Sequence, residues 1–134
     1  MIVVDTNIIA YMTFPSAYSS GVGSLHEKDP IWEAPLLWKS EFLSVIALYY
    51  RKGIINYEEG LAALEFAERL IGSREHEVAA RAIMDAVIGS TCSSYDYHFI
   101  VLARQLGTKL ITYDKKLLGE FPAIALTPDA YLQQ

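Results

Sequence analysis

The sequence predicts an α/β protein in which a central parallel β-sheet is covered by helices on both faces. Two observations support this fold class. Short apolar segments, such as residues 1–4 and 34–38, alternate along the chain with longer segments whose apolar residues recur every three or four positions. Most of the short segments also lack the alternation of apolar and polar residues that is typical of half-exposed strands, so they are expected to be buried on both faces.

The N-terminal part of the chain is predicted to form a strand, a turn and a helix. Residues 1–4 are apolar and rich in β-branched side chains, and the polar turn Asp5-Thr6-Asn7 separates them from a helix that starts at Ile8. Residues 13–30 are rich in Ser, Gly and Pro. We expect a loop there with at most a weak helix near residues 20–25, because each glycine costs a helix ~1 kcal/mol relative to alanine.

The middle of the chain predicts a strand and two strong helices. A second strand is expected over residues 34–38, and Ser40 is expected to cap a helix over 41–52 that Gly53 terminates. Residues 57–71 predict another amphipathic helix, since their apolar side chains recur at helical spacing.

The last part of the chain predicts alternating short strands and helices. Ser93 or Ser94 is expected to start a helix that Gly107 ends. The other elements expected here are a strand over 76–79, a helix over 80–88, a strand over 109–112, a short helix over 115–118 and a strand over 123–126.

Length and composition predict a single soluble domain covering residues 1–134. Hydrophobic residues make up 52% of the chain and charged residues 20%, which excludes a disordered chain. The single cysteine excludes a disulfide framework, and the net charge of −5 excludes a broadly basic nucleic-acid surface. The longest uncharged stretch, residues 6–25, is too polar to span a bilayer, so we expect a cytoplasmic protein without membrane association.

Four acidic residues lie where predicted strands end or predicted helices begin. Asp5 and Asp114 each follow a strand, whereas Glu41 and Asp96 open helices. In open parallel sheets, ligands bind at the carboxyl ends of the strands and the N-termini of the helices that follow. We therefore expect all four carboxylates at one edge of the sheet.

Each of these acids also has a structural explanation, because helix N-caps and first helical turns favour acidic side chains. Four carboxylates at one edge, however, repel one another unless a cation lies among them. Oxygen ligands without Cys or His favour Mg²⁺ or Mn²⁺. Such an ion lowers the pKa of an attacking water and stabilises charge in an in-line displacement, so the acids indicate phosphate chemistry.

The acidic residues occur in four short motifs with a characteristic order. These are Val3-Val4-Asp5-Thr6-Asn7, Ser40-Glu41, Tyr95-Asp96 and Leu110-Ile111-Thr112-Tyr113-Asp114. Together they resemble the motifs of the PIN domain, and more narrowly those of the VapC-type toxins of bacterial and archaeal toxin–antitoxin pairs. The resemblance covers residues 1 to about 132. It implies a three-layer α/β/α domain that holds one or two Mg²⁺ or Mn²⁺ ions and cleaves RNA internally, leaving 5′-phosphate and 3′-hydroxyl ends.

The resemblance also implies a role for individual residues. Asp5 and Asp96 are expected to bind the metal directly, and Glu41 and Asp114 are expected to complete the catalytic metal site directly or through water. Side chains that orient the carboxylates are expected at Asn7 and Thr112, and Thr6 and Ser40 are further candidates.

Partners are implied by the same resemblance. Members of this family commonly form homodimers, and an antitoxin segment covers the acidic site, often with a basic side chain reaching into it. They usually carry a clear helix in the region that matches residues 16–28, whereas the glycines here predict a weak one. The candidates for RNA contact are the basic residues Lys39, Arg51, Lys52, Lys115 and Lys116.

Three alternatives stay open at this point. A phosphatase of the haloacid dehalogenase type also begins with an apolar strand and an aspartate, but it needs a second aspartate where Asn7 stands. A PIN-fold nuclease of RNA processing without an antitoxin has the same motifs, and a small antitoxin gene immediately upstream would separate the two. A PIN-fold module that binds without catalysis is the third alternative. The RNA target is not specified by these motifs.

Overall fold

The computed structural model describes all 134 residues and contains the predicted parallel sheet. Its five strands lie in the order β3-β2-β1-β4-β5, and every neighbouring pair is parallel. Their bounds are β1 (Ile2–Val4), β2 (Trp32–Pro35), β3 (Glu75–His76), β4 (Leu110–Ile111) and β5 (Ala125–Leu126). The central strand β1 pairs with β2 and β4, so the residues that follow these three strands lie at neighbouring positions of one sheet edge.

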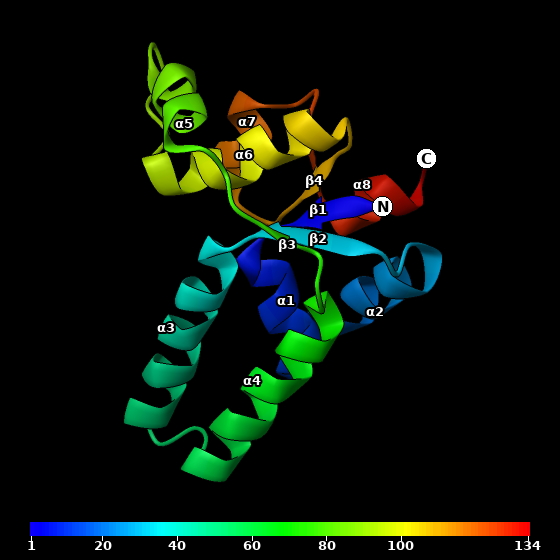
Figure 1. Ribbon diagram of the computed structural model, residues 1–134. Helices are drawn as coiled ribbons and strands as arrows, with labels where there is room; N and C mark the ends of the chain where they lie inside the picture. Colours follow the sequence, from blue (N-terminus) through cyan, green and yellow to red (C-terminus); the bar gives the residue numbers. More distant parts are fainter.

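Helices cover both faces of this sheet and confirm the predicted three-layer α/β/α architecture (Figure 1). Helices α1 (Thr6–Thr13), α3 (Leu37–Arg51) and α4 (Tyr57–Ile71) lie on one face, and α5 (Ala80–Val87), α6 (Ser94–Leu106) and α7 (Lys115–Glu120) lie on the other. The sequence explains this division, because consecutive strand residues point to opposite faces. In β1, Ile2 and Val4 are buried with α1, α3 and α4, whereas Val3 is buried with α6 and α7.

Helices α4 and α6 form where the sequence predicts them, and their ends are well capped. Asn56 and Glu59 form a capping box at the start of α4, in which each side chain accepts a hydrogen bond from the other residue's backbone N–H. The Ser93 hydroxyl accepts from the Asp96 N–H at the start of α6. Gly107 ends α6 in the left-handed conformation, with φ of +65°, which glycine adopts without steric cost.

The second strand and the helix after it differ from the prediction. The strand predicted over residues 34–38 is observed as β2 at Trp32–Pro35. Helix α3 begins at Leu37, earlier than the predicted start at residue 41. Trp38 and Phe42 explain the difference, because they lie one helical turn apart and are both buried in the core. Ser40 therefore lies inside α3 and does not cap it.

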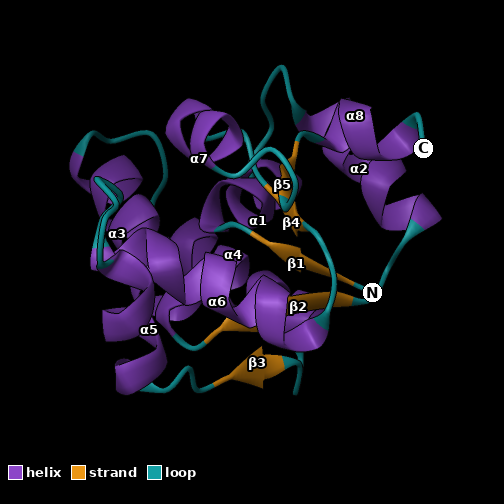
Figure 2. Ribbon diagram, turned by 90° about the horizontal axis from the view of Figure 1, so that it is seen from above, coloured by secondary structure: helices purple, strands orange, loops and turns teal.

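The loop predicted over residues 13–30 contains a complete helix, α2 (Ser19–Lys28), so that prediction is wrong. Val22 and Leu25 are fully buried in the same core as Trp32, and this tertiary burial offsets the helix-weakening glycines. A C-terminal helix, α8 (Pro128–Leu132), packs beside α2 and was not predicted, although the Thr127 cap and Pro128 in the first turn are its usual signals (Figure 2).

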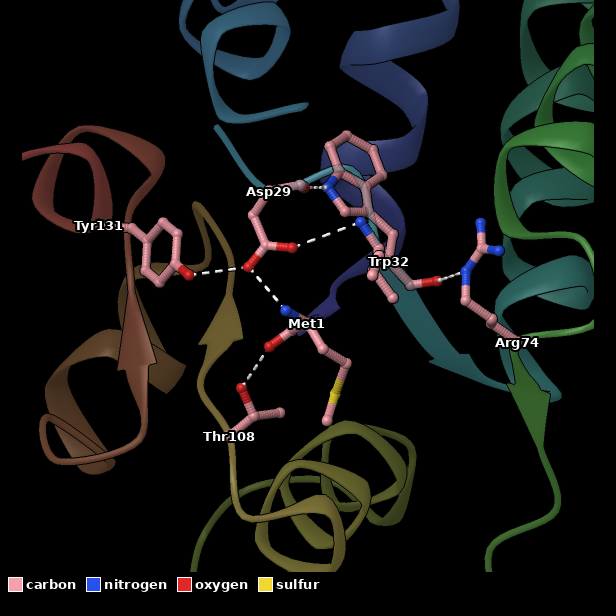
Figure 3. Close-up of polar contacts among 7 residues, drawn as sticks. Met1, Asp29, Trp32, Arg74, Thr108 and Tyr131 are labelled. Carbon is pink, nitrogen blue, oxygen red and sulfur yellow. Dashed lines mark hydrogen bonds and ion pairs between the residues drawn. The ribbon is translucent and has the colours of Figure 1, made fainter. Parts of the chain in front are cut away.

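Polar contacts join these helices to the amino edge of the sheet (Figure 3). The Asp29 carboxylate accepts hydrogen bonds from the Tyr131 hydroxyl at 2.9 Å and from the Met1 amine at 2.8 Å. These donors hold the pKa of Asp29 below its ordinary value, although partial burial opposes the shift. Across the sheet, the Arg74 guanidinium donates to the Trp32 carbonyl at 3.0 Å. These hydrogen bonds stabilise the amino edge of the sheet, whereas the predicted acids Asp5 and Asp114 follow β1 and β4 at the opposite edge.

None of the helices is both long enough and apolar enough to cross a lipid bilayer.

Candidate active site

Asp5 lies at the centre of the candidate site, directly after β1. Its carboxylate accepts hydrogen bonds from the Thr6 backbone N–H at 2.8 Å, from the Thr112 hydroxyl at 2.7 Å and from the Asn7 amide at 3.3 Å. Thr112 follows the neighbouring strand β4 and is fully buried. Pairing of two parallel strands therefore brings Asp5 and Thr112 together across 107 positions of sequence.

Thr112 also links Asp5 to Asp114. Its hydroxyl oxygen accepts from the Asp114 backbone N–H at 2.9 Å and from the Asn7 amide at 3.3 Å, while its proton goes to Asp5. Asp114 uses one carboxylate oxygen, Oδ1, to cap α7 through the N–H groups of Lys116 and Leu117. The other oxygen, Oδ2, has no hydrogen bond within the chain, so Asp114 serves as an N-cap and still presents a free oxygen.

Thr6 connects the first strand to Glu41. The buried Thr6 hydroxyl donates to Glu41 Oε1 at 2.8 Å, which brings the second turn of α3 to the start of α1. Thr6 therefore contacts two of the acids directly, Glu41 through its hydroxyl and Asp5 through its backbone N–H. Ser40 makes no side-chain hydrogen bond and contacts none of the four acids through its hydroxyl, because the helix turns it away from Glu41.

Asp96 is the acid with the most available carboxylate. It lies in the first turn of α6, is partly buried and makes no side-chain hydrogen bond within the chain. Its negative charge contributes to raising the pKa of Glu41, after the larger effect of burial. Asp96 and Glu41 therefore face the same region from opposite sides of the sheet edge.

Burial and mutual repulsion raise the pKa of the central carboxylate. Desolvation is the main cause and brings the pKa of Asp5 to about 6, with further contributions from the charges of Glu41 and Asp114. The hydrogen bonds from Thr112 and Thr6 oppose this shift. The charges of Glu41 and Asp114 thus act on Asp5, and that of Asp96 acts on Glu41, and a bound cation would relieve this repulsion.

The chemistry of this donor set fits a hard divalent cation. All available ligands are carboxylate oxygens, without Cys or His. As placed, no three of the acidic, histidine or cysteine side chains form a closed cage around one ion. Mg²⁺ does not require such a cage, because it commonly binds through one or two carboxylates and keeps several waters. The assignment of Asp5, Glu41, Asp96 and Asp114 as ligands stays a prediction.

The buried charge of Asp5 predicts a measurable effect on stability without metal. Its pKa is about 6 in the folded chain against an ordinary value of 3.8, so the folded state binds the proton more tightly and stability falls as pH rises between these values. Asp5→Asn removes the charge, which should raise the free energy of unfolding at pH 8 in EDTA by at most about 3 kcal/mol. The amide keeps one oxygen for the N-cap but cannot also accept from Thr112, so this loss offsets part of the gain.

The measurement is urea unfolding of both forms in EDTA at pH 5 and pH 8. The gain should be smaller at pH 5, where Asp5 is largely protonated in the folded wild type. Asp85→Asn is the matched control, because Asp85 is exposed on α5 and does not contribute to the pKa shifts of Asp5 and Glu41. A difference in unfolding free energy between variant and wild type that is the same at pH 5 and pH 8 would show that Asp5 is not a destabilising buried charge.

The basic residues considered for RNA contact lie in different places. Arg51 and Lys52 lie at the far end of α3, ~15 Å along the helix from Glu41, on the hairpin that projects from the sheet (Figure 1). Lys39 pairs with Glu68 at 3.2 Å. The remaining two, Lys115 and Lys116, open α7 directly after Asp114.

A cluster around Glu120 was not predicted from the sequence. Its carboxylate accepts from the Thr91 hydroxyl at 2.7 Å and from the buried Cys92 thiol at 3.0 Å, and Lys116 donates to the Thr91 carbonyl. Burial and the adjacent Glu120 raise the pKa of Cys92 to about 11. These contacts join the loop before α6 to α7. Asp96 lies in the first turn of α6, and Asp114 caps the N-terminus of α7. The one sequence signal for this cluster is the four-residue spacing of Lys116 and Glu120, which places both on one face of a helix.

The chain belongs to the PIN domain family, which it matches over residues 2–122. This match confirms the family that the four acidic motifs predicted. In three dimensions the chain is similar to the crystal structure of Mycobacterium tuberculosis VapC20, a Sarcin-Ricin loop cleaving toxin, with a TM-score of 0.67. Sequence identity is 18%, and the alignment covers 92% of this chain and 94% of VapC20, so the likeness establishes a VapC-like fold. The comparison with curated proteins gives no match.

Proposed function

We propose that this protein is a Mg²⁺- or Mn²⁺-dependent endoribonuclease and the toxin of a toxin–antitoxin pair. The observation that carries the proposal is the arrangement of the four acids at the carboxyl edge of a PIN-domain sheet. Asp5, Glu41 and Asp114 are linked through the hydroxyls of Thr6 and Thr112. Membership of the PIN family and the VapC-like fold support the same conclusion.

In the proposed reaction each acidic side chain has a distinct task. The hydrogen bonds to both Asp5 oxygens fix that carboxylate, and Asp96 offers two oxygens that no protein donor occupies. Asp5 and Asp96 would hold a divalent ion, which when bound would supply water activation and neutralise charge on the scissile phosphate. Glu41 Oε2 has no protein partner, and its raised pKa suits it to accept a proton from the attacking water. The products of this hydrolysis carry a 5′-phosphate and a 3′-hydroxyl.

Partner proteins are part of the proposal. An antitoxin segment would cover the acids, and a basic side chain would neutralise them in place of the metal. The projecting α3–α4 hairpin exposes large apolar side chains that a homodimer or antitoxin would bury: Leu43, Leu48, Tyr50, Ile54, Tyr57, Leu61 and Phe66. We infer cytoplasmic function from the expected RNA substrate.

The direct test is cleavage of purified total RNA in EDTA, in MgCl₂ and in MnCl₂. We expect cutting only with a divalent ion, at internal positions, with fragments that adaptor ligation identifies as 5′-phosphorylated. Titration calorimetry with MnCl₂ should show binding that Asp5→Asn weakens. Manganese binding without any RNA cleavage would favour the non-catalytic alternative, whereas equal cleavage in EDTA would contradict a metal-dependent site.

A further inference from the structure

A pocket of about 320 Å³ lies beside the four acids, at the carboxyl ends of β2 and β3. The acids follow β1 and β4, the next two strands in the sheet, so the pocket continues the same edge. The same two helices contribute to both places. Helix α3 provides Ser40 to the pocket and Glu41 to the acids, and α6 provides His98 to the pocket and Asp96 to the acids.

Three of the four polar side chains that line this pocket make no contact that holds the fold together, whereas the fourth, His76, pairs with Glu33 at 2.9 Å. The side chains of Ser40, Glu77 and His98 line it, and none of them makes a hydrogen bond or an ion pair within the chain. His98 is partly buried, with its imidazole available beside the apolar side chains of Leu37 and Val78. Ser40 and Glu77 lie exposed at the mouth of the pocket, and Leu36, Leu37 and Val78 form its apolar part. Apolar side chains with a few converging polar groups are the features of a small ligand site.

We propose that this pocket receives one unstacked RNA base next to the scissile phosphate and selects bases that carry an exocyclic amino group. This inference rests on the proposed function, because it takes the acids as the place of cleavage. Proteins read single-stranded RNA by stacking splayed bases on rings such as histidine and by hydrogen bonding to the base edges. The volume is at the lower end of ligand pockets, ~300–1,000 Å³, which suits a single heterocycle.

The chemical preference follows from Glu77. A carboxylate only accepts hydrogen bonds, so it pairs with the amino group of cytosine, adenine or guanine. Uracil can offer the Glu77 carboxylate only its N3–H, which lies between two carbonyl oxygens that repel the carboxylate. The pocket should therefore disfavour uracil, and cytosine and uracil test this cleanly because the two rings have nearly the same shape.

The experiment measures binding of fluorescein-labelled hexanucleotides, oligo(rC) and oligo(rU), by fluorescence anisotropy. Wild type is titrated in EDTA, and Asp96→Asn is titrated in MgCl₂, so that neither sample cleaves RNA under the proposed mechanism. We expect oligo(rC) to bind about 5- to 10-fold tighter than oligo(rU), at the low end of discrimination by a base contact. Glu77→Gln should remove this preference, because an amide donates as well as accepts.

Two further variants separate recognition from general charge and folding effects. Glu58→Gln removes one exposed acid on α4, away from the pocket, and should leave the ratio of the two affinities unchanged. His98→Ala should weaken both oligonucleotides several-fold through loss of stacking. Equal affinity for the two oligonucleotides, or a preference that survives Glu77→Gln, would overturn the pocket assignment even if RNA is cleaved. A Glu77-dependent preference without cleavage in Mg²⁺ would support the pocket and count against the nuclease.

Discussion

Replacing Asp96 by asparagine is expected to reduce Mg²⁺-dependent RNA cleavage by about 10³-fold while leaving the fold intact. Asp96 makes no side-chain hydrogen bond within the chain, so the substitution disturbs no internal contact. It does remove a carboxylate from a site where charge on the scissile phosphate must be balanced, and losses of ~10²–10³ are typical when one such electrostatic group is removed.

The measurement is single-turnover cleavage of a defined RNA together with thermal unfolding and Mn²⁺ titration. The variant should unfold at the temperature of wild type or higher, because it removes a repulsion with Glu41, and it should bind Mn²⁺ more weakly. Asp85→Asn provides the matched control with the same change of charge on exposed α5. Cleavage by Asp96→Asn at the rate of wild type would remove Asp96 from the proposed mechanism.

Thr112→Val is expected to affect both stability and activity. The side chain is fully buried, and its hydroxyl donates to Asp5 and accepts from the Asp114 N–H and the Asn7 amide. Valine has almost the same shape but leaves these groups without their partner, so unfolding should become easier by about 1–3 kcal/mol. Because Asp5 loses its orienting donor, cleavage should also fall by about 10- to 100-fold.

Thr112→Ser separates the hydroxyl from the methyl group. Serine keeps the hydrogen bonds and should restore cleavage to within a few-fold of wild type, although loss of the buried methyl still costs about 1 kcal/mol. Loss of the Thr112 donor also raises the pKa of Asp5 further, so the pH profile of Thr112→Val should shift upward. A serine variant as inactive as the valine variant would assign Thr112 a packing role alone.

The fold was predictable from the sequence because its strongest elements are locally consistent. Residues 57–71 form a helix with those bounds, since Asn56, the apolar stripe and the following glycine all agree. Elements that depend on tertiary burial were misjudged. In α2 the local helix propensity is poor, and burial of Val22 and Leu25 stabilises the helix. The start of α3 is apolar and resembles a strand in sequence, but Trp38 and Phe42 are buried together one helical turn apart.

The candidate site was predictable in its acids but not in its connections. Asp5 and Asp114 follow strands, and parallel pairing of β1 with β4 necessarily places them at one edge. The contact of Thr6 with Glu41 could not be predicted, because it depends on how far α3 turns before it meets α1. Glu77 and His98 carry no sequence signal of their own, since only the fold brings them into a shared pocket.

The contact between Cys92 and Glu120 allows thiol labelling to detect local separation of α7 from the loop before α6. The thiol is buried, hydrogen-bonded to a carboxylate and has a pKa of about 11, so alkylating reagents cannot reach a reactive thiolate in the closed structure. As the chain contains a single cysteine, its labelling rate measures the free energy of separating α7 from the loop before α6. The two helices that carry Asp96 and Asp114 thus have a natural kinetic probe between them.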